Sequence, residues 1–89
     1  MKAVVTVIGH DAVGIIAAAS GALSGRGVNI LDITQSVFGN IFAMVMYVDL
    51  SGLTISFPDL ADEMTALGER LGLKIHTMHE DIFNSMHRI

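Results

Sequence analysis

The sequence has no cysteine and few charged residues, and both shortages limit what the chain can be. Without cysteine there is no disulfide framework, no thiol nucleophile and no thiolate metal site. Charged residues make up 16 % of the chain, against about 25 % in an ordinary soluble domain. Five Lys and Arg against nine Asp and Glu give a net charge of −4. This charge argues against a surface that follows phosphates, so we expect no nucleic-acid partner.

What the sequence has in excess is apolar surface. Its 89 residues make one domain, because chains divide into domains only well above this length. A domain of this size buries only about 60 % of the surface that its unfolded chain exposes, yet 52 % of the residues are hydrophobic. That composition excludes disorder. It also predicts a partner that covers apolar surface, most simply a second copy of the chain.

No apolar run approaches the length of a membrane span. The first 21 residues do resemble a signal peptide, with a lysine, apolar residues and three consecutive alanines. His10 and Asp11 interrupt that segment, however, and its removal would delete a strand and half a helix. We therefore expect no membrane partner and a cytoplasmic location.

The spacing of the apolar positions alternates between the period of a strand and that of a helix. It predicts strands over 2–8, 28–38, 41–49 and 73–80, and helices over 12–26 and 56–71. Asp11 is expected to cap the first helix and Ser56 the second. Gly27 and Gly72 are placed to end these helices in the left-handed conformation. Gly39-Asn40 makes a tight reversal that pairs its two flanking strands.

The predicted order is strand, helix, strand, strand, helix, strand. Similar segments, Gly27-Val28-Asn29-Ile30 and Gly72-Leu73-Lys74-Ile75, occupy equivalent places in its two halves. Right-handed crossovers in both halves put both helices on one face of a four-stranded antiparallel sheet. The predicted fold is therefore α+β, the ferredoxin-like βαββαβ arrangement, over residues 1–80.

Both faces of that sheet are apolar, although helices cover only one of them. Over 41–49 the two alternating sets of side chains are Phe42, Met44, Met46 and Val48 on one face, and Ile41, Ala43, Val45 and Tyr47 on the other. The tail over 81–89 has an apolar helical face made of Ile82, Phe83, Met86 and Ile89. We expect the tail to be a short helix that folds only by packing on the sheet or on a partner subunit.

The segment GHDAVGI, Gly9 to Ile15, is the first candidate binding site. Its two glycines let the backbone approach a ligand, and the start of a helix offers unpaired amides to a carboxylate such as that of an amino acid. Asn29, at the start of a strand, offers a donor and an acceptor that suit a zwitterion. Structural roles stay open for both, with Asp11 as a helix cap and Asn29 as a turn residue after Gly27.

The sequence favours neither a catalytic nor a metal site. His76 and His79 lie three apart in a predicted strand, so they point to opposite faces and cannot chelate together. Only an early end of that strand would let His79, Glu80 and His87 approach one another. No serine lies in a nucleophile-elbow pattern. We expect no enzyme activity, no metal and no cofactor.

RNA-recognition motifs share this strand order, and Asn40 to Tyr47 (NIFAMVMY) overlays their third-strand signature in part. Met44 stands where a stacking aromatic residue is needed, and the first strand has no aromatic residue. Because stacking platforms need those rings, we do not expect RNA binding.

The βαββαβ pattern, together with VTVIGHDAVGIIAAASGALSGRGVNILDITQ, resembles the ACT domain, a regulatory module that typically binds amino acids. The ending HEDIFNSMHRI resembles that of a subfamily of small stand-alone ACT-domain proteins. The resemblance spans the whole chain.

This resemblance implies where a ligand would lie. In ACT domains it usually sits between subunits, held by the turn after the first strand of one subunit and by the start of the second strand of its neighbour. The residues implied here are Asp11, Ala12, Val13, Gly14, Ile15, Asn29 and Ile30, with Gly14 as the motif glycine. Subunits commonly pair edge to edge, which would cover an exposed sheet edge. Members of the subfamily often carry Lys-Asp-Arg where this chain has His10-Asp11-Ala12. Because this chain lacks those two basic residues, the positive partners left for an anion are the amide dipoles and a protonated His10.

The residues and the resemblance together predict a non-catalytic, homodimeric regulatory module that binds a small amino acid or a related carboxylate at its subunit interface. The alternative is an adaptor, an assembly protein without a small-molecule ligand. Such an adaptor would hold a protein partner with the second sheet face and the tail.

The tail gives the first test of this interpretation. Deleting residues 82–89 is expected to lower the melting temperature and to weaken dimerisation, because it uncovers the apolar surface on which the tail packs. Thermal unfolding and analytical ultracentrifugation measure these two effects. Unchanged melting together with unchanged dimerisation would refute the role given to the tail.

Overall fold

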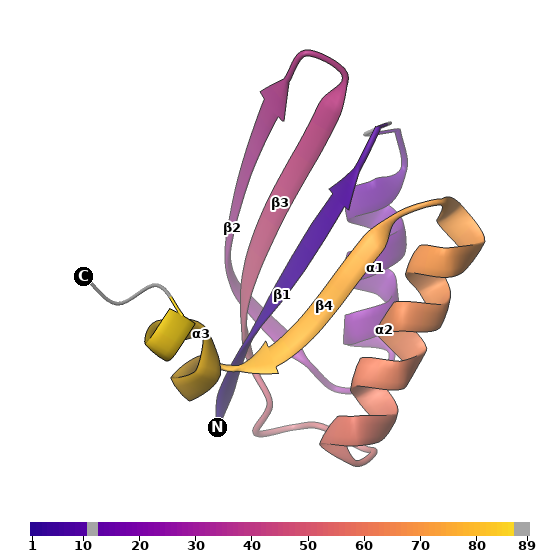
Figure 1. Ribbon diagram of the computed structural model, residues 1–89. Coiled ribbons are helices and arrows are strands. Elements are labelled where there is room, and N and C mark those ends of the chain that lie inside the picture. Colours follow the sequence, from indigo (N-terminus) through magenta and orange to yellow (C-terminus); the bar gives the residue numbers. More distant parts are fainter. Residues whose placement is uncertain (11–12, 87–89) are drawn as a thin grey trace.

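The computed structural model describes residues 1–10 and 13–86 (Figure 1). Its strands are β1 (Lys2–Gly9), β2 (Asn29–Phe38), β3 (Ile41–Asp49) and β4 (Lys74–His79), and its helices are α1 (Ile15–Ser24), α2 (Phe57–Leu71) and α3 (Glu80–Met86). The described residues thus have the predicted βαββαβ order followed by a short C-terminal helix, which confirms the ferredoxin-like fold. No helix among them is both long enough and apolar enough to cross a membrane.

The strands form one antiparallel sheet in the order β2-β3-β1-β4, with β2 and β4 as its edges in the described part of the chain. Helices α1 and α2 lie on one face of this sheet (Figure 1). Directly paired residues point to the same face. Val5 of β1, for example, pairs with Met46 of β3 and with Thr77 of β4, and all three face the helices.

The core lies between the helices and this face, and the alternation predicted for β3 is confirmed. Its strand residues include Ala3, Val5 and Val7 of β1 and Phe42, Met44, Met46 and Val48 of β3. Its helix residues include Ile15, Ala19 and Leu23 of α1 and Leu60, Met64 and Leu67 of α2. Burial of one such side chain is worth roughly 1.5–3 kcal/mol, so this layer is the main source of stability.

Helix α2 begins and ends at the residues that the sequence predicts. The Ser56 hydroxyl accepts a hydrogen bond from the Asp59 amide at 3.2 Å, which caps the first turn. At the other end Gly72 is left-handed with φ 73°. The Leu73 amide then donates to the Gly68 carbonyl at 2.8 Å, which satisfies a carbonyl of the last turn.

The predicted bounds of the first helix, 12–26, are wrong. Helix α1 runs from Ile15 to Ser24, and its N-cap residue is Gly14, which is left-handed with φ 75° and gives no side-chain cap. A left-handed residue cannot lie inside a right-handed helix, so the helix starts only after Gly14. Asp11 is therefore not the N-cap residue, and it lies, with Ala12, outside the described residues.

The chain forms a 3₁₀ turn directly after the C-terminal end of α1. The Arg26 amide donates to the Leu23 carbonyl and the Gly27 amide to the Ser24 carbonyl, each at 3.0 Å, with the spacing of a 3₁₀ turn. Gly27 is left-handed with φ 79°, as predicted. The Val28 amide then donates to the Leu23 carbonyl at 3.1 Å and completes the stop.

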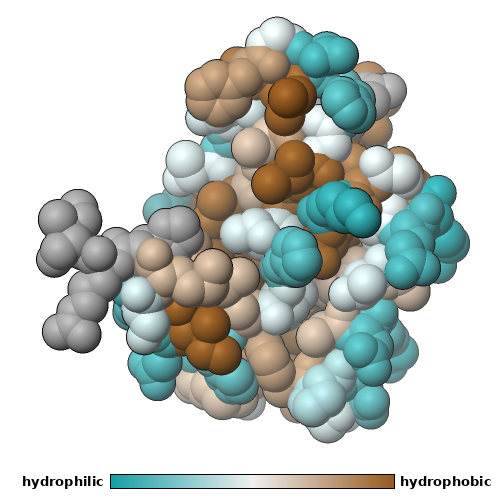
Figure 2. Space-filling model, in the orientation of Figure 1, coloured by the Kyte–Doolittle hydropathy of each residue, from teal (hydrophilic) through white to brown (hydrophobic). Residues whose placement is uncertain are grey.

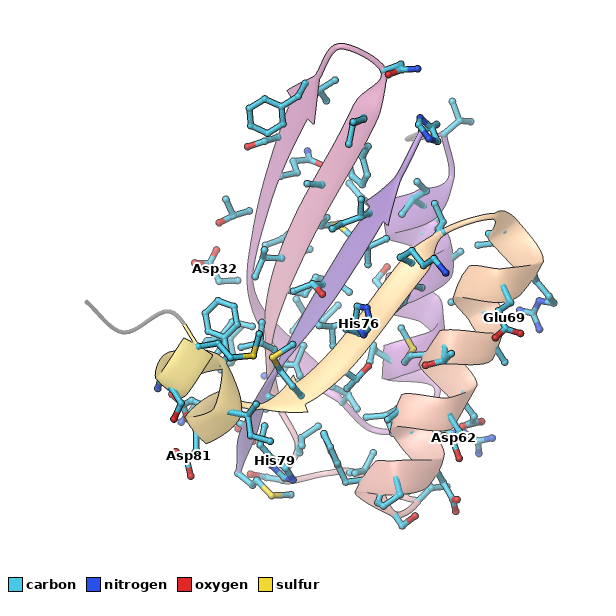
Figure 3. All side chains as sticks on the ribbon, viewed as in Figure 1. Asp32, Asp62, Glu69, His76, His79 and Asp81 are labelled. Carbon is cyan, nitrogen blue, oxygen red and sulfur yellow. The ribbon has the colours of Figure 1, made fainter. Side chains whose placement is uncertain are left out.

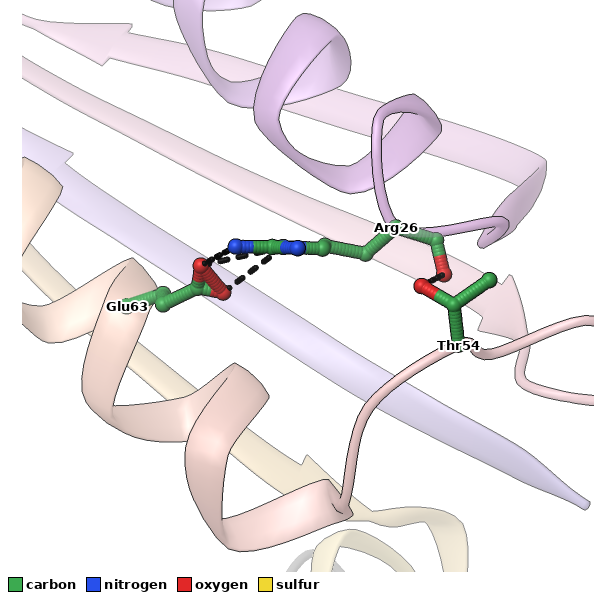
Figure 4. A network of polar contacts seen from close by, with 3 residues as sticks. All are labelled: Arg26, Thr54 and Glu63. Atoms are coloured by element: carbon green, nitrogen blue, oxygen red, sulfur yellow. Dashed lines mark hydrogen bonds and ion pairs between the residues drawn. The ribbon is translucent and has the colours of Figure 1, made fainter.

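Arg26 joins the end of α1 to the loop before α2 and to α2 itself (Figure 4). The Arg26 carbonyl accepts hydrogen bonds from the Thr54 amide and hydroxyl, at 2.9 and 3.2 Å. The Arg26 Nε lies 3.0 Å from both carboxylate oxygens of Glu63 in α2. Gly27 lies so close to the loop between β3 and α2 that a Cβ at position 27 would overlap the Gly52 carbonyl. The exposed ion pair itself adds little stability, so close backbone packing holds this junction.

The second sheet face is covered at one end only in the described part of the chain. Helix α3 lies beside the end where β1 begins and β4 ends (Figure 1), and Val4 on this face is buried. Farther along, Ile8, Ile41 and Phe38 are 49, 43 and 68 % exposed. Hydrophobic residues gather over the upper part of this face in Figure 2. We call Ile8, Phe38, Ile41 and Val45 the open patch.

The left-handed glycines give a paired test. Gly39 has φ 61° and open space where a Cβ would lie, whereas a Cβ at Gly27 would meet the Gly52 carbonyl. Gly39→Ala should cost about 1 kcal/mol, from left-handed strain alone. Gly27→Ala should cost about 3 kcal/mol or more, because a steric collision adds to the same strain. Urea unfolding measures both free energies, and equal costs would contradict the close packing at Gly27.

Candidate functional site

The predicted ligand-binding residues form two groups in the structure. The first group lies where β1 ends and α1 begins. Val13 and Gly14 are exposed there, while Ile15 is buried as the first residue of α1. The predicted Asp11 and Ala12 belong to the same turn by sequence but fall outside the described residues.

Gly9, which opens this turn, has a packing reason to be glycine. A Cβ at Gly9 would overlap the Leu73 side chain, and Leu73 is itself buried. The turn therefore lies close to Leu73, the residue that precedes β4, and this contact packs the end of β1 against the start of β4.

The second group, Asn29 and Ile30, lies at the other end of the sheet. Asn29 pairs with Asp49 of β3, and Asp49 also pairs with Lys2 at the start of β1. Gly9 lies seven residues farther along β1, which is about 23 Å of strand. A single chain therefore does not bring the two predicted groups together.

Asn29 and Ile30 line a shallow groove of about 600 Å³ between β2 and α1. The helix contributes only small residues to it, namely Ala17, Ser20, Gly21 and Ser24. No charged residue occurs in the sequence from Val13 to Gly25. Because β2 is an edge strand of the described sheet, this uncharged groove runs along a surface that a second chain can reach.

The end of the sheet that holds Asn29 also carries a carboxylate. Oδ1 of Asp49 accepts hydrogen bonds from the Ser51 hydroxyl at 2.7 Å and the Ser51 amide at 2.9 Å. These bonds lower the pKa of Asp49, so it is ionised at neutral pH. A lowered pKa in the folded state stabilises the fold above the unfolded pKa, and this contribution is lost as the pH falls through the folded pKa.

The end that holds Gly9 carries bases. A hollow of about 280 Å³ is lined by Ile8, Gly9, His10, Ile41, Gly72 and Lys74. Lys74, the first residue of β4, pairs with Ile8 of β1. No local pattern in the sequence pointed to Lys74, because only strand pairing brings it beside His10. One signal did exist, since Lys74 occupies in the second half of the chain the place that Asn29 occupies in the first.

The histidines do not form a site in the described residues. His76 and His79 point to opposite faces of β4, as predicted (Figure 3). His79 faces the helices and stacks on Phe57, with ring centroids 4.1 Å apart. Among residues 1–10 and 13–86 no group of three His, Cys, Asp or Glu side chains could hold a metal ion. His87, which belonged to the alternative metal cluster, lies outside those ranges.

Tyr47 joins the second sheet face to α3. Its hydroxyl donates a hydrogen bond to Oε1 of Glu80 at 2.6 Å. This bond to a carboxylate, together with burial, raises the pKa of Tyr47. The contribution of this hydrogen bond to folding stability is therefore complete below the pKa of Tyr47 in the unfolded chain, about 10. It is lost as the pH rises through the higher pKa of Tyr47 in the folded chain.

Sequence comparison relates the chain to known proteins over its whole length. The profile of the ACT domain matches residues 2–78. A UPF0237 protein of Methanocaldococcus jannaschii is 47 % identical over 88 residues, which are 99 % of this chain and 98 % of that protein. A UPF0237 protein of Listeria innocua is 44 % identical over 89 residues, which are 100 % of both chains.

Structural comparison gives the same relationship. An ACT domain protein from Streptococcus pneumoniae superposes with a TM-score of 0.83 at 38 % sequence identity. The match covers 98 % of each chain, so it includes the region of α3.

The hydrogen bond between Tyr47 and Glu80 gives a test of how α3 is held. Tyr47→Phe should accelerate amide hydrogen exchange of residues 80–86 severalfold near neutral pH, because it removes the donor and leaves the ring in place. Exchange in α2 should stay unchanged. Glu80→Gln keeps an acceptor and should retain most of the protection. If α3 in Tyr47→Phe exchanges at the wild-type rate, the bond does not hold the helix.

Proposed function

The chain belongs to the ACT domain family, and from this membership and the geometry of its two end groups we propose that it is a non-catalytic regulatory module that binds a small amino acid or a related carboxylate between two copies of itself. ACT domains are generally regulatory ligand-binding modules. For this chain we propose three further things: the class of ligand, the dimer and the residues that bind the ligand.

The observation that carries the proposal is the separation of the two predicted groups. The turn that contains Gly14 and the strand start at Asn29 lie at opposite ends of one sheet. One ligand of amino-acid size cannot touch both ends of one chain. A second copy related by a two-fold axis can supply the missing group at each end, so two copies would make two equivalent sites.

Strand β2 is suited to make that contact. It is a ten-residue edge strand, and Leu31, Ile33 and Val37 are exposed on it. A long edge strand with exposed apolar side chains is a ready partner for another strand. Antiparallel pairing of β2 with its copy sets Asn29 of one chain opposite Phe38 of the other. Because Phe38 lies at the Gly9 end of the sheet, this pairing would move Asn29 of the second copy toward the turn.

Helix α1 favours the same assembly. Its face along the groove carries Ala17, Ser20, Gly21 and Ser24, which are small enough for two helices to approach closely. That face has no charge to desolvate. Val13 and Ile16 are 88 and 38 % exposed at the start of the helix, so the rim of the proposed site offers apolar contacts as well.

Binding at an interface would couple the ligand to assembly. A ligand that touches both copies stabilises the dimer over its separated chains, by mass action. The stabilised dimer could then present a different surface to another protein. This linkage is the proposed route by which a module without catalytic residues would regulate.

The open patch favours a second candidate function, the adaptor. Its residues Ile8, Phe38, Ile41 and Val45 are exposed, and Ile82 and Met86 of α3 are 52 and 65 % exposed. In this candidate the ACT-like unit over 1–80 and the tail over 81–89 hold a protein partner together. The ligand would then be absent and Asn29 would be only a turn residue.

A thermal-shift screen of the twenty amino acids, followed by calorimetry, tests the proposal. A ligand present at 100 times its dissociation constant should add about 2.7 kcal/mol, which raises the melting temperature of a domain of this size by roughly 11–22 °C. Asn29→Ala should remove most of this shift and keep the dimer, because the side chain binds the polar head of the ligand. Asn84→Ala, in α3, is the matched control and should respond as the wild type does.

The same variants separate the two candidates. An adaptor would show no shift with any amino acid and no effect of Asn29→Ala, and it would lose its protein partner when Met86 or Phe83 is replaced by Asp. A regulatory module would keep its ligand response in those variants. Sedimentation of a stable monomer at micromolar concentration, with and without amino acids, would overturn the dimer-interface site.

A further inference from the structure

The hollow at the Gly9 end of the sheet differs in charge from the hollow at the other end. Its titratable lining residues, among those described, are His10 and Lys74, and both are bases. The hollow at the opposite end mixes the bases Lys2 and His79 with the carboxylates Glu80 and Asp81. The chain as a whole has a net charge of −4. A concave surface that gathers bases on an acidic protein attracts anions.

The other walls of this hollow are apolar and fixed. Ile8 and Ile41 line it and belong to neighbouring strands of the sheet. Lys74 is held by its pairing with Ile8 and by the left-handed turn at Gly72 that precedes β4. A site built on paired strands keeps its geometry better than a site built on loops. The volume of about 280 Å³ lies just below the usual range for drug-sized ligands, so the hollow suits a smaller molecule.

We propose that this hollow is the carboxylate-binding part of the ligand site, with the Lys74 ammonium group as the counter-charge of the carboxylate. Ile8 and Ile41 would contact a short aliphatic group of the same ligand. The inference rests on the proposed function, since it takes the turn after β1 as part of the ligand site. It adds a binding residue, Lys74, and a ligand chemistry, a small monocarboxylate.

The charge of Lys74 should give two ligands of the same shape but different charge different affinities for this hollow. A hydrogen bond between an ammonium group and a carboxylate is charge-assisted and stronger than one to a neutral amide. An acid should therefore bind more tightly than its amide, in which the shape is kept and the negative charge is lost. One such pair is 2-methylpropanoate and 2-methylpropanamide, whose branched carbon chain fits apolar walls.

Titration of the full chain with these two probes, at constant ionic strength and followed by backbone amide NMR, tests the inference. The acid should shift the amide signals of Gly9, His10 and Lys74, with a dissociation constant about tenfold below that of the amide. Lys74→Gln should remove most of this preference. Lys2→Gln makes the same change of net charge at the far end of the sheet and should keep the preference. Thermal unfolding confirms that both variants remain folded.

Three results would overturn the inference. They are equal binding of acid and amide, no shift at Gly9, His10 and Lys74, and an equal loss of acid binding in Lys74→Gln and Lys2→Gln. One chain alone forms this hollow, so a monomer can still bind the acid there. A negative result for the hollow can therefore be told apart from a negative result for the dimer-interface site. Acid binding at Lys74 with no effect of Asn29→Ala on any ligand response would keep this site and reject the interface.

Discussion

Two helices can cover one face of a four-stranded sheet, and the surfaces left uncovered shape the rest of this molecule. Strands β1 and β3 carry apolar side chains on both faces of the sheet. Helices α1 and α2 bury the side chains of one face, so those of the other face need a different contact to be buried. Helix α3, whose Glu80 accepts a hydrogen bond from Tyr47, lies at one end of that other face. The open patch and the β2 edge stay exposed in the described part of the chain. Apolar surface left in this way favours association.

The topology also separates the two ends of the sheet chemically. Strands β1 and β2 run in the same direction, so the end of β1 and the start of β2 lie at opposite ends. The first end carries the bases His10 and Lys74, and the second carries Asn29 and the ionised Asp49 beside Lys2. Antiparallel association of two chains would bring these ends together, with bases of one chain near a carboxylate of the other. A zwitterion has the matching distribution of charge.

Local signals in the sequence predicted most of the fold, and they did so where one residue decides the conformation. Ser56 caps α2 and Gly72 ends it, as expected. Gly27 is left-handed, as expected, but α1 ends earlier than predicted, at Ser24. The start of α1 was wrong because two local signals competed. Asp11 looked like a cap, but Gly14 is left-handed, and a helix cannot extend back through it. The end of a helical pattern indicated a positive φ at Gly27 and Gly72, but no such local pattern marked Gly14.

The sequence by itself determined the order of strands and helices and the face that each residue of β1 and β3 presents, because alternation and caps act between near neighbours. It also identified Asn29 and the turn after β1 as candidates for binding. Only the tertiary structure decided that these candidates lie apart and that Lys74 lies beside His10. Those distances depend on which strands pair and in which register. Pairing between distant segments is set by packing of the whole core, which no local pattern in the chain encodes.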